Sequence, residues 1–411
     1  MIRTSEFKWL LVALGAIAVL TPAITCVAPR VMGTFFIAFG LLGMIADCAS
    51  KKRWPDFDWK LTLFTCALLG WGAVSIFWSI APEDTTGKLG QLGAIFITLA
   101  FLKERIDHFT ENDLQFLGKM LLIGAGAGAI VYYFEWFSGF FLYDYFHPDN
   151  GDVIDNKQNK AIVMLGFWAA VAFPFVASLK NKALYAVYAV LIAAIAWATF
   201  QSPSSSAIRI LQILPFFIVV VTFVPWRRAV VSAMVIGAMI LSFAMLPASR
   251  AVAIHTDWYS SPSLPSSIKA RLEMWDQASR RILERPVLGW GLDSSPHLPN
   301  RGELLVSEDD NDPWAPPRPI AHLHPHNAPL QIWFELGLPG MALIAAMLGI
   351  TGYGILRARR RVAYVFGVTM FAYMFLMTLS IWGIWQTWFI AMLCFTGLMA
   401  NAGVRRLEDQ A

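Results

Sequence analysis

Long apolar runs recur along this chain, and their length constrains the fold more than any other feature. About twelve runs reach the roughly 17–25 residues that an α-helix needs to cross a bilayer. In lipid every backbone group must bond within its own segment, so such runs fold as helices. Only 15% of the 411 residues are charged, where a soluble domain carries about a quarter. The sequence therefore predicts an all-α polytopic membrane protein with about twelve transmembrane helices.

The runs divide the chain into three parts. We expect about nine helices within 1–248, one long hydrophilic loop over 249–326, and about three more helices within 327–411. The first run resembles a signal peptide, but the alternation of the later loops requires a retained helix. A helix is also predicted inside the long loop, with its start near Pro265 and its stop at Pro286. Its apolar stripe indicates that it lies along the membrane–water boundary.

The loops between the runs alternate in charge. One set is basic, as in Lys51-Lys52-Arg53 and Arg359-Arg360-Arg361, whereas the intervening loops are neutral or acidic, as in Glu308-Asp309-Asp310. Because short basic loops stay in the cytoplasm, both termini should face inward and the long loop outward. The net charge of +4 is too small to indicate a nucleic-acid partner.

Three arginines on the predicted outer side are candidates for binding an anion. Arg209 opens an apolar run from an otherwise uncharged loop, Arg271 lies one turn before Trp275 in the predicted loop helix, and Arg285 precedes a glycine-rich turn. Planar guanidinium groups bind phosphate oxygens bidentately, so two of them could hold a diphosphate. For Arg285 the favoured interpretation is contact with lipid headgroups.

Three histidines alternate just before the tenth predicted helix: His322, His324 and His326. This spacing permits a zinc site, but no cysteine, His-Glu-x-x-His spacing or firm fourth ligand accompanies it, so we favour no metal. His326 stands out because it precedes Asn327, which can cap the helix, and because imidazole can take a proton near neutral pH. His322 and His324 are expected to be surface or hydrogen-bonded residues.

These residues carry a resemblance to the O-antigen ligase and O-antigen polymerase superfamily. The Ser202-to-Arg209 stretch is similar to a serine and arginine element of that family, although Arg209 does not directly follow a serine. The remaining matching segments, in chain order, are Arg271-x-x-x-Trp275-x-x-Ala278, Glu284-Arg285-Pro286-x-x-Gly289-x-Gly291 and His326-Asn327-x-x-Leu330-x-x-x-x-Glu335-x-Gly337-x-x-Gly340.

The resemblance implies inverting, metal-independent and cofactor-free glycosyl transfer on the periplasmic face of the bacterial inner membrane, in a GT-C-like fold with one large periplasmic loop. The donor would be a glycan on undecaprenyl diphosphate, and the acceptor of a ligase would be a sugar hydroxyl of lipid A–core. His326 would be the general base, and Arg209 and Arg271 would hold the diphosphate. Asn327, Glu335 and Arg285 would support them.

Three functions remain as alternatives. An O-antigen ligase is the first choice. The second is a polymerase of the same superfamily that extends O-antigen or exopolysaccharide repeats. The third is a flippase or transporter for a polyprenyl-linked sugar, which would require ionisable residues in the middle of the membrane and inverted repeats. The sequence shows neither of these features.

Overall fold

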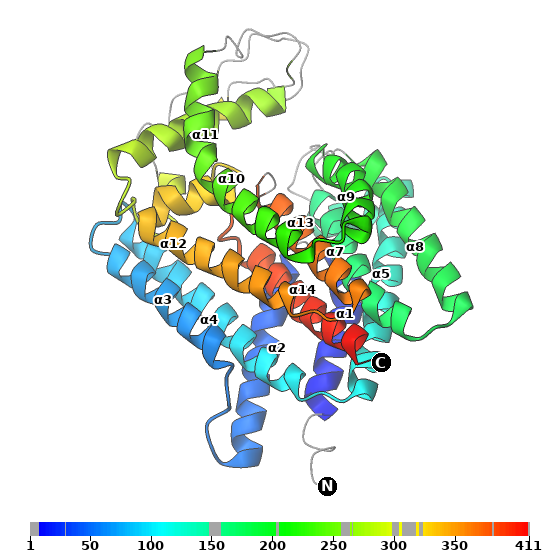
Figure 1. The fold of residues 1–411 in the computed structure, drawn as a ribbon. Helices are drawn as coiled ribbons and strands as arrows, with labels where there is room; N and C mark the ends of the chain where they lie inside the picture. Colours follow the sequence, from blue (N-terminus) through cyan, green and yellow to red (C-terminus); the bar gives the residue numbers. More distant parts are fainter. Residues whose placement is uncertain are drawn as a thin grey trace.

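The computed structural model describes residues 8–28, 30–147, 158–202, 205–255, 264, 266–297, 304–305, 318–319, 324–379 and 382–409. Helices account for almost all of its regular structure (Figure 1). In the first half of the chain they are α1 (Lys8–Thr25), α2 (Val31–Lys51), α3 (Trp59–Ser75), α4 (Pro82–Asp107), α5 (Glu111–Phe137), α6 (Phe141–Phe146), α7 (Asn159–Ser178), α8 (Lys182–Gln201) and α9 (Ser205–Phe223).

The second half continues the helical pattern around one long connection. It contains α10 (Arg227–His255), α11 (Ser266–Glu284), the short 3-10 helix η2 (Ser295–His297), α12 (Ala328–Leu356), α13 (Arg361–Thr378) and α14 (Thr387–Glu408). Within the connection, β1 (Leu304–Leu305) pairs antiparallel with β2 (Arg318–Pro319).

The predicted all-helical membrane fold is confirmed. In the described part of the chain, nine helices are long and apolar enough to cross a membrane: α2, α4, α5, α7, α8, α10, α12, α13 and α14. Two shorter apolar helical stretches lie in α1 and α9. The count of twelve spans stays a prediction. So does the division of the chain, and its boundary at 248 falls inside α10 because that helix continues to His255.

Two helices are longer than the apolar runs that predicted them. The fourth apolar run of the sequence, 89–102, lies within α4, which starts at Pro82 with Glu83 and Asp84 in its first turn, where a proline and negative charges favour a helix. The tenth apolar run of the sequence, 338–356, lies within α12, which starts at Ala328, directly after the predicted cap at Asn327. Its first turns carry buried polar side chains, and these lower the hydropathy of that part of the helix.

The largest buried side chain, Trp168 on α7, marks the centre of the core. Its indole N–H donates to the carbonyl of Ala18 on α1 at 2.8 Å, and its ring stacks on Phe395 of α14 at 5.1 Å between centroids. Large aromatic rings bury the most apolar area, so this contact joins three helices that are far apart in sequence. The core therefore supports α14, which lies near the centre of the molecule (Figure 1).

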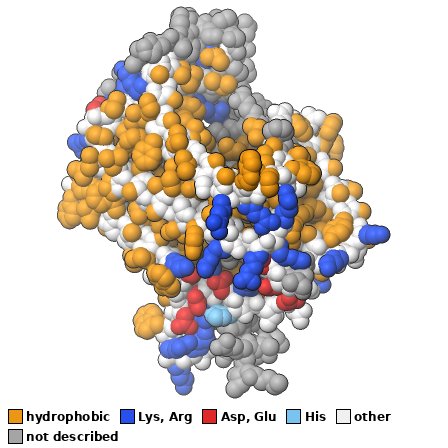
Figure 2. Space-filling view, viewed as in Figure 1, with side chains coloured by type: hydrophobic (Ala, Val, Ile, Leu, Met, Phe, Trp, Pro, Cys, Tyr) orange, Lys and Arg blue, Asp and Glu red, His pale blue; other side chains and the backbone are white. Residues whose placement is uncertain are grey.

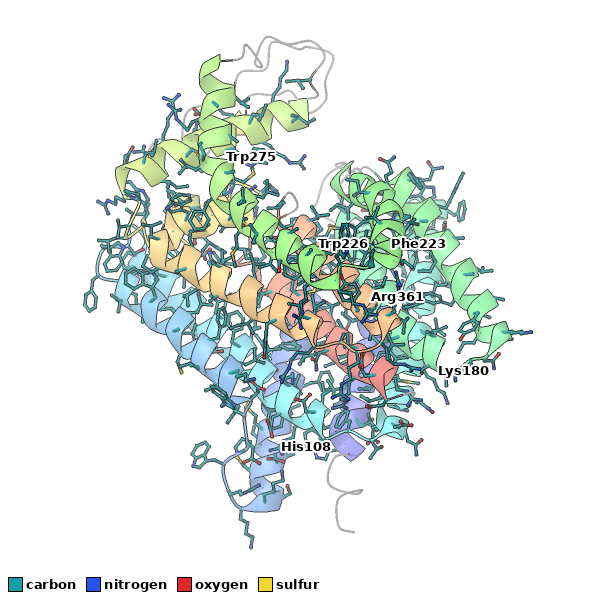
Figure 3. The ribbon with its side chains drawn as sticks, viewed as in Figure 1. His108, Lys180, Phe223, Trp226, Trp275 and Arg361 are labelled. Atoms are coloured by element: carbon teal, nitrogen blue, oxygen red, sulfur yellow. The ribbon has the colours of Figure 1, made fainter. Side chains whose placement is uncertain are left out.

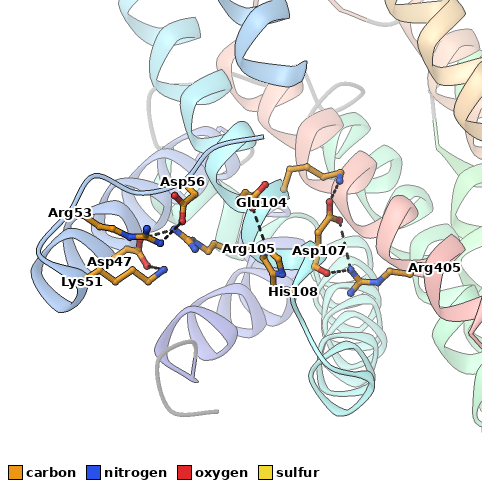
Figure 4. A network of polar contacts seen from close by, with 10 residues as sticks. Asp47, Lys51, Arg53, Asp56, Glu104, Arg105, Asp107, His108 and Arg405 are labelled. Atoms are coloured by element: carbon orange, nitrogen blue, oxygen red, sulfur yellow. Dashed lines mark hydrogen bonds and ion pairs between the residues drawn. The ribbon is translucent and has the colours of Figure 1, made fainter. Parts of the chain in front are cut away.

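Charged side chains gather at one end of the bundle, the end that carries His108 (Figures 2 and 3). Arg105 of α4 donates to Asp47 of α2 at 2.7 Å, and both side chains are buried. Arg405 of α14 donates to the carbonyls of Ile106 and Asp107 at 2.9 and 2.7 Å (Figure 4). These contacts join α2, α4 and α14 at the end where the sequence places its basic loops.

Replacing Arg105 with alanine should lower the free energy of unfolding by about 2 kcal/mol, because it leaves the buried Asp47 with one fewer partner. The loss is limited because Lys51 still pairs with Asp47 at 3.0 Å. Arg53→Ala is the matched control, since its pair with Asp56 is exposed and should contribute less than about 1 kcal/mol. Thermal unfolding of the purified protein in detergent measures both, and equal losses would contradict the assignment.

Candidate functional site

The helix α12 is broken near its start, and this break organises the end of the bundle opposite His108. Gly337 has φ 62° and ψ −158°, which is not helical, and Pro339 has no backbone N–H. In an unbroken helix the carbonyls of Phe334, Glu335 and Leu336 would accept from residues four positions later. At the break the N–H of Leu338 donates elsewhere and Pro339 has no N–H, so the carbonyls of Phe334 and Glu335 need other donors.

Residues 286–293, which we call the glycine turn, supply the missing partners. The backbone N–H of Trp290 donates to Phe334 and that of Gly291 to Glu335, both at 2.9 Å. In return Leu338 donates to the carbonyl of Val287 at 3.1 Å. The carbonyl of Leu336 accepts from the indole of Trp71 on α3 at 2.8 Å. Tertiary contacts thus close a gap in the helix that would otherwise leave buried polar groups unpaired.

Three glycines make this close approach possible. Gly289, Gly291 and Gly337 have φ of 70°, 106° and 62°, a region that side chains other than glycine rarely adopt. A Cβ on Gly289 would lie 2.5 Å from the carbonyl oxygen of Glu335, and one on Gly337 would clash with that of Val287. The glycines of the family-like segments therefore act here as a structural lock between α12 and the glycine turn.

One face of the first turns of α12 carries three buried polar side chains, which we call the polar ladder: Asn327, Gln331 and Glu335. They lie four residues apart, so they share one stripe of the helix. Each contacts the connection between α13 and α14. Asn327 donates to the carbonyl of Leu379 at 3.2 Å, Gln331 accepts from the backbone of Ile384 at 3.0 Å, and Glu335 accepts from the indole of Trp385.

The ladder is also bonded within itself and to the glycine turn. Gln331 donates to Glu335 at 3.0 Å, and the backbone N–H of Asp293 donates to the same carboxylate at 2.7 Å. The predicted cap is confirmed, since the Asn327 side chain accepts from the N–H of Leu330 at 3.1 Å. A fully buried carboxylate is stable only with several hydrogen-bond donors. Glu335 receives them from α12, from the glycine turn and from the connection between α13 and α14.

A partly buried ion pair lies beside the ladder. Lys88 of α4 is 3.2 Å from Asp293 and also donates to the carbonyl of Trp385 at 3.3 Å. Burial raises the pKa of the Asp293 carboxyl, and the neighbouring Lys88 ammonium opposes that shift. Neither residue could be predicted from the sequence, because their ordinary loop and helix-end positions give no signal of this contact.

The histidine segment lies directly against these elements. His324 is buried and contacts the amide of Gln386 at 2.8 Å, and its ring lies edge-to-face with that of His326 at 4.6 Å between centroids. His326 is half-buried and has φ 51°, a conformation in which histidine is enriched. The carbonyl of Pro325, the residue before His326, accepts from the indole of Trp275 at 2.7 Å.

The hydrogen bond from Trp275, which is labelled in Figure 3, to Pro325 joins α11 to the histidine segment. Arg271 is half-buried and one helical turn before Trp275, so the two side chains share a face of α11 about 6 Å apart. The helix is held by Asp276, which binds Arg250 of α10 and Arg280 of its own helix. The structure thereby brings Arg271 to the same helix face that contacts the histidine segment.

The other two predicted arginines lie elsewhere. Arg285 is exposed, and its guanidinium stacks on the ring of Trp290 at 4.2 Å, where it stabilises the glycine turn. Arg209 lies in the first turns of α9, and its side chain is outside the described residues. The helix α9 packs on α13, whose last residues lead to the carbonyl that Asn327 binds.

The predicted boundary helix is held by protein contacts. Ile282 of α11 is fully buried in a cluster with Trp290, Leu330 and Phe334, against which Trp275 also packs. Its apolar stripe therefore packs on α10 and α12, and its position at the membrane–water boundary stays a prediction. This packing is what fixes the position of Arg271 along the bundle.

A metal site would need several ligands close together. Among the described residues no group of three His, Cys, Asp or Glu side chains has that arrangement. His322 lies outside the described residues, and His324 and His326 are the two described histidines of this segment. The structure adds Gln331, Gln386 and His324 to the candidate site. Polar residues at 327, 331 and 335, four positions apart, are the sequence pattern from which the polar ladder could have been predicted.

Comparison with known proteins points to one family. Residues 188–345 match the family model described as O-antigen ligase. That segment includes all six candidate site residues: Arg209, Arg271, Arg285, His326, Asn327 and Glu335. No solved structure matches the chain significantly.

Curated relatives agree with the family match. A provisionally named polysaccharide ligase of Rickettsia bellii is 23% identical over 333 residues, which cover 78% of this chain and 75% of the relative. Similarly named proteins of Rickettsia conorii and Rickettsia prowazekii are 29% and 30% identical over 121 and 124 residues. Those two matches cover 29% of this chain and 28% of each relative.

Proposed function

We propose that this chain, whose residues 188–345 match the O-antigen ligase family model, is an O-antigen ligase of the bacterial inner membrane. It would transfer a glycan from undecaprenyl diphosphate to a sugar hydroxyl of lipid A–core by inverting, metal-independent transfer. Both termini would face the cytoplasm and the site the periplasm. The contact between Trp275 and Pro325 carries the proposal, because it brings the face of α11 that bears Arg271 to the segment that bears His326.

The reaction needs a base and a place for negative charge. His326 would take the proton of the acceptor hydroxyl, whose oxygen then bonds to the anomeric carbon of the donor sugar from the side opposite the diphosphate. The bond between that carbon and the diphosphate oxygen breaks, and the configuration inverts. The leaving diphosphate gains charge but needs no proton, so fixed guanidinium groups of Arg209 and Arg271 would stabilise it.

The remaining contacts would hold these groups in place. The cap by Asn327 and the ladder contacts of Glu335 fix the start of α12, from which His326 projects. A site that is held within about 0.5 Å of its productive geometry depends on such supporting contacts. Arg285 would act indirectly, because its stacking on Trp290 stabilises the glycine turn.

Arg271→Ala should reduce glycan transfer by at least about tenfold more than Arg285→Ala, since only Arg271 would contact the developing charge. The reason is positional: Arg271 lies one turn from the contact with the histidine segment, whereas Arg285 is exposed on Trp290. Initial rates of the purified variants, compared at equal amounts of folded protein, measure the difference. Equal losses would remove the distinction between the two arginines.

Deletion of the gene in its native bacterium tests the function itself. Loss of a ligase should leave bare lipid A–core on a gel, with long glycan retained on the lipid carrier. Loss of a polymerase should instead leave core that bears a single repeat unit, which would replace the proposal with the polymerase function. Unchanged glycan on both lipids would contradict a glycosyl-transfer function in either form.

A further inference from the structure

His324 is held in a single tautomer by two neighbouring side chains. The indole of Trp388 can only donate, and it donates to the Oε1 atom of Gln386 at 2.8 Å. The amide nitrogen of Gln386 therefore faces the Nε2 atom of His324, 2.8 Å away. Because an amide nitrogen only donates, Nε2 must accept, and the proton of the neutral ring sits on Nδ1.

The ring of His324 remains neutral in the folded protein. Its exposed fraction is 7%, and burial lowers its pKa to about 3, with the adjacent His326 acting in the same direction. A neutral ring with Nε2 occupied cannot exchange protons as a general base near neutral pH. Its remaining polar group is the Nδ1–H, a fixed hydrogen-bond donor.

This donor has no partner among the described residues. The Nδ1 atom is fully buried, and within the described part of the chain it makes no hydrogen bond. Leaving such a donor unpaired costs about 1–3 kcal/mol, so buried groups of this kind are rare and require an explanation. Gln386 and Trp388 fix the ring so that this Nδ1–H keeps one position. A fixed donor of this kind is stable only when an acceptor pairs with it.

The position of His324 indicates what pairs with the donor. Its ring lies edge-to-face with that of His326, the proposed base, at 4.6 Å between centroids. The same segment leads through Pro325 to Trp275 and the face of α11 that bears Arg271. A molecule that places a hydroxyl at His326 would bring its other oxygens close to His324.

We propose that the Nδ1–H of His324 donates a hydrogen bond to an oxygen of the glycan substrate bound beside His326, and that Trp388 and Gln386 position this donor. This inference rests on the proposed function. The oxygen belongs either to the diphosphate of the donor or to the sugar of the acceptor, and the two share the chemistry of a hydrogen-bond acceptor. His324 thus binds and orients the substrate, whereas His326 moves the proton.

Two substitutions at His324 separate the donor from the rest of the ring. Asparagine can place an amide N–H near the position of Nδ1, whereas glutamine reaches the position of Nε2 and keeps the contact with Gln386. His324→Gln should therefore lose about 10- to 100-fold in kcat/KM, and His324→Asn should retain clearly more activity. A rise in the KM of the donor assigns the oxygen to the diphosphate, and a rise in that of the acceptor assigns it to the sugar.

Gln386→Glu tests the tautomer itself. The carboxylate still accepts from Trp388 but now requires a proton on Nε2 of His324, so the neutral ring loses its Nδ1–H. In alkaline buffer this variant should fall about 10- to 100-fold below the original protein. At lower pH the ring takes a second proton, Nδ1–H returns, and the ratio of the two activities should recover.

The outcomes are decisive as long as the unfolding midpoints match that of the original protein. Equal activities of His324→Gln and His324→Asn, or a Gln386→Glu variant as active as the original in alkaline buffer, would overturn the inference. Either result leaves the proposed function intact. If the original protein transfers no glycan in the same assay, the proposed function fails instead.

Discussion

Replacing His326 with alanine is expected to slow glycan transfer by about 10²–10⁴-fold, which is the usual contribution of a positioned general base. The acceptor hydroxyl is a weak nucleophile, so loss of the proposed base should act directly on the chemical step. Its neighbour His324 is fixed in a neutral tautomer by Gln386. Initial rates with donor and acceptor in excess measure the chemical step.

Two controls keep this result specific. His326→Asn tolerates the left-handed backbone at φ 51°, so it should fold like the original protein and be equally inactive. His108→Ala changes an exposed histidine at the opposite end of the bundle and should keep full activity (Figure 3). A normal glycan ladder from cells that carry only the alanine variant would refute the assignment of the base.

Gly337→Ala is expected to lower the free energy of unfolding by about 3–5 kcal/mol. An alanine at φ 62° costs about 1–3 kcal/mol, and its Cβ would clash with the carbonyl of Val287. The glycine turn would then have to move, which breaks the hydrogen bonds of Trp290 and Leu338 at about 1 kcal/mol each. Activity should fall with stability, because the turn also delivers Asp293 to Glu335.

Gly354→Ala is the matched control in the same helix. Gly354 is exposed, and nothing lies within 4 Å of a Cβ built there. The substitution should leave stability unchanged or raise it by up to about 1 kcal/mol, because alanine favours a helix. Unfolding of both variants in detergent gives the comparison. A Gly337→Ala variant as stable as Gly354→Ala would show that the break in α12 needs no glycine.

The sequence predicted the membrane class and the composition of the candidate site better than its geometry. Apolar runs of bilayer length are a local property, so most helices were predicted near their observed positions. The cap at Asn327 and the helix in the long loop also follow from local rules, and the structure confirms both. The assignments of His326, Arg209 and Arg271 to chemistry stay predictions.

The contacts that could not be predicted from the sequence share one physical cause. Glu335, Gln331 and the glycine turn interrupt the apolar pattern, so the apolar run that predicts α12 covers only 338–356 and gives no information on the contacts of these residues. In the structure the backbone groups at this interruption bond to a segment that is distant in sequence, because the glycine turn at 286–293 donates hydrogen bonds to carbonyls of α12. Likewise, His324 was expected to be a surface or hydrogen-bonded residue; it is hydrogen-bonded but buried, and Gln386 lies 62 residues away in sequence.

The amino-acid sequence alone determined that this chain is a bundle of membrane helices with its ionisable groups near the helix ends, because transfer into lipid selects long apolar runs whatever their neighbours are. Only the tertiary structure decided which of those groups meet. Hydrogen bonds and ion pairs act over a few ångströms, so the partners of Glu335, His324 and Lys88 exist only after α4, α11, α12 and α14 have packed together.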